Sequence, residues 1–201
     1  MAENTKYTDL THPLFPEVHY HIFNHANGKH NIFFTEENRR YFLQKYDNYM
    51  YNYVETFAYC LMPNHFHLQI QVRNKQALLA AAKIDFPTGL SKATRKAVDS
   101  FQDKTDLTDE EASSIVSERF RRFFMSYSKS INKYAKIEGS LFRKNFRRKP
   151  IHTMAYFLGC IAYIHRNPAH HGFTMDWKDW KWSSYGRILL PNITHLNKIQ
   201  H

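Results

Sequence analysis

One stretch of strict alternation constrains the fold of this chain more than any other feature. In the segment 61–72, LMPNHFHLQIQV, every second residue from position 66 is apolar, and the residues between them are histidine or glutamine. Successive side chains of a β-strand point to opposite faces, so this pattern indicates a strand with one apolar and one polar face. The Pro63-Asn64 pair fits a hairpin corner, which predicts a partner strand at residues 55–62.

Other patterns along the chain predict the remaining elements. Aromatic and β-branched residues indicate a strand at 18–24, and Thr35 can cap a helix that runs to about Tyr53. Further on we expect a basic helix at 118–137, a short strand at 146–151 and a helix at 153–167. For the basic helix we expect a cap at Ser117 and a stop at Gly139, and for the last helix an end at Pro168. Antiparallel strands with helices packed on them predict an α+β fold.

The chain length favours one main domain with short appendages. We assign residues 1–17 to an N-terminal arm, 18–190 to the domain and 191–201 to a tail. Within the domain, residues from about 75 to 117 look like a helical insertion, with two weakly amphipathic stretches at 76–84 and 88–101.

The charge of the chain points to a polyanionic partner. Its formal net charge is +10 and its isoelectric point about 9.5, a balance that favours nucleic acid, although a solvated basic surface would give the same total. No apolar run is long enough to cross a membrane, and the N-terminus lacks an apolar signal core. We therefore expect a cytoplasmic protein, in which Cys60 and Cys160 are free, buried thiols.

The histidines of the alternating strand are candidate metal ligands. His65 and His67 fall on its polar face, which argues against a position in the core, and two imidazoles at this spacing can converge on one cation. Two histidines alone also fit a structural role. His19 and His21 have the same spacing, but Phe23 interrupts the polar face of their strand, so we interpret that pair as structural.

The helix expected at 153–167 carries a second candidate set. Tyr156, Cys160, Tyr163 and Asn167 align on one side, whereas another side looks like core and carries Met154, Phe157, Ile161 and Ile164. An asparagine oxygen can ligate a hard cation, and a phenol one turn away can then point at whatever that cation holds. Ordinary packing is the alternative interpretation of Tyr163.

Several ordered motifs together resemble a known family. MPNHFHL, then GSLFRKNFRRKP, YIHRNP, HHGF and WKWSSY are similar to segments of the HUH single-strand DNA transposases, above all the REP-associated tyrosine transposases and the insertion-sequence 200-like transposases. The resemblance spans roughly residues 18–185. One departure is the turn after Asn24, where relatives often have Asn-Arg-Gly and this chain has His25-Ala26-Asn27-Gly28. Another is the length of the 75–117 region.

The resemblance implies a fold, a site and a reaction. The fold would be a ferredoxin-like antiparallel sheet with helices. His65, His67 and Asn167 would bind a divalent metal, Mg²⁺ or Mn²⁺, and Tyr163 would attack single-stranded DNA that carries hairpins. The working unit would be a monomer or a homodimer. Two alternatives stay open, namely a catalytically silent hairpin-binding module and a metal-dependent phosphodiesterase that uses water instead of tyrosine.

Basic residues interleaved with aromatics mark a predicted DNA path. Charges of this kind follow phosphates while rings stack on bases, which suits single strands and hairpins. The three tryptophans Trp177, Trp180 and Trp182 we interpret instead as packing residues. The predicted nucleic-acid-binding residues are Arg119, Arg121, Arg122, Lys129, Arg143, Lys144, Arg147, Arg148 and Lys149.

Overall fold

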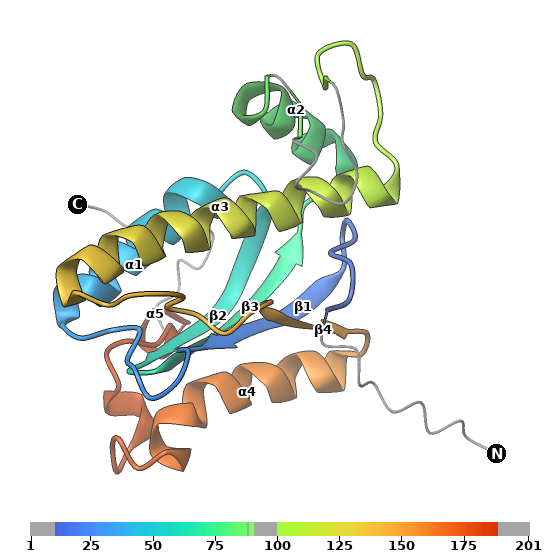
Figure 1. The fold of residues 1–201 in the computed structure, drawn as a ribbon. Coiled ribbons are helices and arrows are strands. Elements are labelled where there is room, and N and C mark those ends of the chain that lie inside the picture. The colour runs from blue at the N-terminus through green and yellow to red at the C-terminus, as the bar shows by residue number, and fades with distance from the viewer. Residues whose placement is uncertain (1–10, 88, 91–99, 189–201) are drawn as a thin grey trace.

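A four-stranded antiparallel sheet organises the protein (Figure 1). The structure is a computed structural model that describes residues 11–87, 89–90 and 100–188. The strands are β1 (His19–His25), β2 (Val54–Met62), β3 (His65–Val72) and β4 (Arg147–Ile151), in the order β2-β3-β1-β4. This order and the antiparallel pairing confirm the predicted α+β fold.

Helices cover both faces of the sheet. On one face lie α1 (Glu36–Met50) and α3 (Asp109–Ala135), and α4 (Met154–His170) crosses the other (Figure 1). The smaller helices are α2 (Lys75–Asp85), the 3₁₀ turn η1 (Trp177–Asp179) and α5 (Tyr185–Ile188). None of the helices in the described residues is long and apolar enough to span a membrane.

The apolar face of β3 packs as its alternation predicts. Phe66, Leu68 and Ile70 are fully buried in the main core, with Phe42 of α1 and Phe123 of α3. Burying large side chains of this kind contributes about 1.5–3 kcal/mol each, so the sheet and these two helices form the stable centre of the fold. Cys60 and Cys160 are free and buried, as expected, in a smaller cluster between the sheet and α4.

The first turn of α3 lies well before its predicted start. We expected the helix at residue 118 with Ser117 as its cap, but it begins at Asp109 and Thr108 is its cap. The acidic residues interpreted as insertion form its first turn, where three carboxylates face the positive end of the helix dipole. The helix ends at Ala135, and its C-cap, Lys136, adopts a left-handed conformation three residues before the predicted stop at Gly139.

Two other predictions concern the amphipathic stretches before α3 and the N-terminal arm. The amphipathic stretch at 76–84 is a helix, α2, whereas most of the stretch at 88–101 lies outside the described residues. The described part of the N-terminal arm is anchored to the core, because Leu14 is fully buried and its N–H donates to Ser113 Oγ of α3 at 2.9 Å.

Replacing Thr108 by alanine is expected to lower the free energy of unfolding by about 1 kcal/mol. Thr108 Oγ1 accepts the N–H of Glu111 at 3.2 Å, and Glu111 Oε2 accepts the N–H of Thr108 at 3.0 Å. Alanine leaves one helix-end N–H without this acceptor. Chemical denaturation measures the change. Thr105→Ala is the matched control, since Thr105 is exposed and outside the helix, and equal effects of the two variants would contradict the assigned start of α3.

Candidate active site

Histidines from two neighbouring strands meet on the sheet face that α4 covers. In the antiparallel register His25 lies opposite His65, and Phe23 lies opposite His67. The rings of His25 and His65 stack with centroids 4.7 Å apart, and His21 Nε2 lies 2.9 Å from His67 Nδ1. The group His21, His25, His65 and His67 is named the histidine cluster below.

The polar character of this face argued against a position of the histidines in the core, but the structure buries both of them. His65 and His67 are only 3% and 4% exposed. The alternation of β3 correctly separates its two faces, but it cannot show that α4, far along the chain, covers the polar one. Burial of these two rings is tolerated in part because both nitrogens of His65 and the Nδ1 of His67 have hydrogen-bond partners, namely Asn64, Asn167 and His21.

The interpretation of the earlier histidine pair as structural needs a correction for one member. His21 belongs to the histidine cluster through its contact with His67. His19 lies apart, with its ring against the edges of Phe57 and Phe157 at centroid distances of 5.2 and 5.0 Å. His21 and His25 could have been found by noting that 19, 21, 23 and 25 all share one strand face.

The helix α4 brings Tyr163 and Asn167 to the histidine cluster. The Tyr163 ring lies edge-on to the rings of His67 and His21, with centroids 5.5 and 5.9 Å apart. One turn later Asn167 is 1% exposed, and its Oδ1 lies 3.0 Å from His65 Nε2, 102 residues away in sequence. Tyr163 is 44% exposed, so a ligand could reach it. The four predicted site residues, Tyr163, Asn167, His65 and His67, therefore lie close together within one chain. Their roles in metal binding and catalysis stay predictions.

The helix itself differs from its prediction in two ways. It continues through Pro168 to His170, because the last turn is closed by other bonds, including His171 N–H to Asn167 O at 3.1 Å. Met154 was predicted to be core but is 70% exposed, since it precedes the part of the helix that reaches the sheet. Ile164 is buried as expected. His165, which the sequence did not single out, is buried and lies 2.8 Å from Ser184 Oγ.

Burial keeps the cluster imidazoles uncharged near neutral pH. Desolvation, with a smaller effect of the Lys149 charge, lowers the pKa of His21 to about 4. Desolvation lowers the pKa of His65 to about 4 as well, and the pKa of His67 lies well below its usual value. Burial also lowers the pKa of His25, assisted by the positive charges of Arg143, His171 and Arg147. Neutral imidazoles are the form that ligates metals.

The donor atoms fit a hard divalent cation. His65 Nδ1 lies 2.7 Å from Asn64 Oδ1 and its Nε2 lies 3.0 Å from Asn167 Oδ1, yet a neutral imidazole has only one N–H to donate. If that proton faces Asn64, the Nε2 lone pair and the Asn167 oxygen face each other, which a cation would stabilise. Adjacent ligands of an octahedral ion at about 2.1 Å are about 3.0 Å apart, so Mg²⁺ or Mn²⁺ fits this pair.

The second imidazole completes an open donor set. His67 Nδ1 is held by His21, and its Nε2 has no hydrogen-bond partner among the described residues. No group of three or more His, Cys, Asp or Glu side chains arranged to hold a metal occurs in the described residues, so the candidate set is two imidazoles and one amide. Such a set leaves positions for phosphate oxygens and water, unlike a closed structural zinc site.

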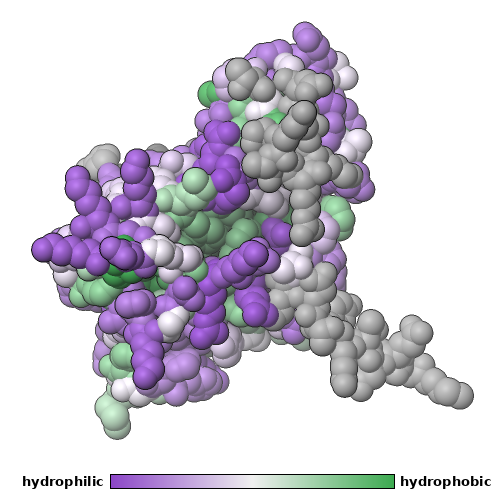
Figure 2. Space-filling model, in the orientation of Figure 1, coloured by the Kyte–Doolittle hydropathy of each residue, from purple (hydrophilic) through white to green (hydrophobic). Residues whose placement is uncertain are grey.

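A basic groove lies on the α3 side of the sheet, next to β4. It has a volume of about 840 Å³ and runs between α3 and the segment that leads into β4. Figure 2 shows an apolar floor there with hydrophilic side chains at its rim. Phe124 and Phe146 supply aromatic surface, and the cations that line the groove are Arg121, Lys129, Arg143, Lys144 and Arg148.

Ion pairing separates the predicted DNA-binding residues into two groups. Arg119 is largely buried, pairs with Asp85 at 3.3 Å and packs on Tyr49 and Tyr53. These contacts give it a structural role, so we no longer include it in the predicted DNA-binding set. Arg121 and Arg122 both pair with the buried carboxylate of Glu118, which reduces their net charge toward a ligand. Within the described parts of the chain no ion pair engages five of the others, Lys129, Arg143, Lys144, Arg147 and Lys149.

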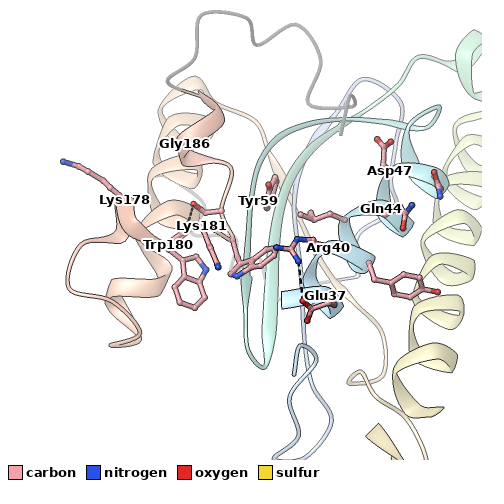
Figure 3. A pocket seen from close by; sticks show the side chains of 14 residues that line it. Glu37, Arg40, Gln44, Asp47, Tyr59, Lys178, Trp180, Lys181 and Gly186 are labelled. Carbon is pink, nitrogen blue, oxygen red and sulfur yellow. Dashed lines mark hydrogen bonds and ion pairs between the residues drawn. The ribbon is translucent and has the colours of Figure 1, made fainter. Parts of the chain in front are cut away.

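A second cavity, of about 780 Å³, lies between α1 and residues 178–186 (Figure 3). Its charges are largely satisfied internally, since Arg40 pairs with Glu36 and Glu37, and Lys181 also pairs with Glu36. Trp182 packs on the main core and Trp180 on the smaller cluster, which confirms the predicted packing role of these two residues. Trp177 packs against Tyr185.

Comparison with known proteins adds one result. No protein-family model and no curated protein matches this chain. Its fold resembles that of a solved tyrosine transposase. That structure is a REP-associated tyrosine transposase bound to a REP hairpin, with a TM-score of 0.52 and 15% sequence identity over 93% of this chain and 84% of the other. At this identity the likeness establishes the shared fold, and the family suggested by the motifs stays a prediction.

Proposed function

We propose that this protein is a metal-dependent tyrosine transposase that cleaves and rejoins hairpin-containing single-stranded DNA. The observation that carries the proposal is the convergence of Tyr163 and Asn167 of α4 with His65 and His67 of β3. The structural similarity to a hairpin-bound transposase and the basic groove beside the site support the same function.

The proposed reaction exchanges one phosphoester for another. Tyr163 Oη attacks the phosphorus in line, the bond from phosphorus to the 3′ oxygen breaks, and a 5′-phosphotyrosine forms. The phenol loses its proton and the departing 3′ oxygen gains one. A 3′-hydroxyl of a second strand can then attack the phosphotyrosine, which rejoins DNA without ATP. A divalent cation held by His65, His67 and Asn167 would withdraw charge from the non-bridging phosphate oxygens.

Contacts within the protein orient the groups that would take part in this exchange. Asn64 fixes the ring orientation of His65, and His21 does the same for His67, as outer partners of metal-binding histidines commonly do. The exposed phenol of Tyr163 stands over the cluster, where it can meet a bound phosphate. The helix keeps the Asn167 oxygen one turn from the nucleophile, because residues four apart share a helix side.

The test begins with selection of bound DNA from a randomised hairpin library, because the target sequence is unknown. Selected hairpins with single-stranded flanks are then incubated with the protein and Mg²⁺ or Mn²⁺. We expect a covalent protein–DNA adduct that survives denaturation and a free 3′-hydroxyl, both abolished by chelator. Tight binding without scission would support the silent module instead.

A further inference from the structure

The basic segment before and within β4 divides between the two faces of the sheet. The strand β4 is the edge strand of the sheet; it pairs with β1, and one isolated parallel bridge joins its Arg148 to Thr11. Its register sets Arg147 opposite Phe23 and Arg148 opposite Ile22. Directly opposed residues of antiparallel strands point to the same face. Arg147 therefore shares the face of the histidine cluster, and Arg148 shares the face of the main core.

The direct contacts of Arg148 agree with this division. Its Nη1 donates to Ser117 Oγ of α3 at 3.0 Å, and its guanidinium lies 4.9 Å from the centroid of the Phe146 ring. Arg148 thus lines the groove on the α3 side, together with Lys129 and Lys144.

Arg147 occupies the same cross-strand row as one candidate metal ligand. The row runs from Arg147 on β4 through Phe23 on β1 to His67 on β3. Neighbouring strands lie about 4.8 Å apart, so the backbones of Arg147 and His67 are separated by about 10 Å, much of which an arginine side chain can span. Phe23 lies between them, and the centroid of its ring is 5.7 Å from that of the His67 ring.

The charge of Arg147 is available to a ligand. The residue is exposed, and it forms no ion pair with a carboxylate in the described ranges, in contrast to Arg121 and Arg122 on α3. A planar guanidinium can bind two oxygens of a phosphate at once, and it stabilises charge that develops during transfer. On the groove side, Lys129 and Lys144 offer point charges that follow a DNA backbone without such geometry.

We propose that Arg147 binds the reacting phosphodiester on the histidine face, whereas Lys129 and Lys144 hold the hairpin stem in the groove across the β4 edge. The inference rests on the proposed function and assigns the cations of that function to separate tasks. The DNA would then pass around the outer edge of the sheet at β4, where Thr11 makes its isolated bridge to Arg148.

The test compares Arg147→Ala with Lys129→Ala and Lys144→Ala on a selected hairpin. For Arg147→Ala we expect the rate of adduct formation at saturating DNA to fall about 10²-fold, while Kd changes less than about threefold. Arg147→Lys should recover only part of the rate. Each groove variant should raise Kd and reduce the slope of log K against log salt by about one, and its effect on Kd should exceed its effect on the saturated rate.

Crosslinking supplies a readout that does not need cleavage. A photoreactive group introduced at position 147 or at position 144 is tested in the Tyr163→Phe background with labelled hairpin DNA. We expect position 147 to crosslink to the single-stranded flank and position 144 to the stem. Stem crosslinks from both positions would overturn this inference, and so would equal changes in Kd and rate for Arg147→Ala and Lys144→Ala. Neither result would contradict the proposed transposase function. Absence of any adduct with wild-type protein overturns the proposed function and this inference with it.

Discussion

Replacing Tyr163 by phenylalanine is expected to abolish the covalent protein–DNA adduct and to lower strand cleavage by about 10³-fold or more. The change removes only the phenolic oxygen, which is the proposed nucleophile, and keeps the ring that packs against His67 and His21. Hairpin affinity should stay near that of the wild type, because the groove cations are untouched. Denaturing gels detect the adduct, and a labelled 5′ or 3′ end reports cleavage.

Tyr134→Phe is the matched control, since Tyr134 is also exposed and lies at the far end of α3. It should leave both adduct and cleavage unchanged. If Tyr163→Phe still cleaves while no adduct forms with either protein, water is the nucleophile and the phosphodiesterase alternative is correct. If Tyr163→Phe forms the adduct as well as wild type, another side chain attacks.

Replacing His67 by glutamine is expected to lower metal-dependent cleavage by about 10²-fold or more. His67 is a candidate metal ligand, and its loss leaves only His65 and Asn167 in the donor set. Glutamine keeps a polar side chain in this buried site, so large destabilisation is not the expected cause. The readouts are the initial cleavage rate and the Mn²⁺ concentration needed for half-maximal activity, which should rise.

His19→Gln is the matched control for this variant. His19 lies on the same sheet face, so the same change from histidine to glutamine can be made there. Its ring packs against Phe57 and Phe157 and not against Tyr163. Its rate and metal requirement should match those of the wild type. Equal losses in His19→Gln and His67→Gln would mean that the face tolerates no change and that His67 has no special role.

Local sequence signals located most elements of the fold. The alternation of 65–72 marks β3 to the residue, and Thr35 caps α1 as predicted, with a capping box that includes Asn38. The errors fall where two local signals compete. At the start of α3 the acidic run resembled a solvated insertion, but Thr108 and Glu111 make it a capped first turn. At Pro168 the proline rule predicts a helix end, and the tertiary setting carries the helix one turn further.

The histidine cluster shows the limit of reading one strand at a time. His65 and His67 were found from their own alternation. The strand face that carries His25 can be inferred from the alternation of its own strand, but its position opposite His65 is known only from the register. The basic segment poses the same problem, because Arg147 and Arg148 are neighbours in sequence yet lie on opposite faces of β4.

The sequence by itself determined which residue types stand on each side of β3 and at one-turn spacing along α4, since both follow from the repeat of the backbone. It also supplied the net positive charge and the ordered motifs. Only the tertiary structure decided that α4 covers the polar face, that Asn167 Oδ1 comes within 3.0 Å of His65 Nε2, and that His21 joins His67. These distances depend on strand order and on which sheet face each helix covers, and both are set by contacts between segments far apart along the chain.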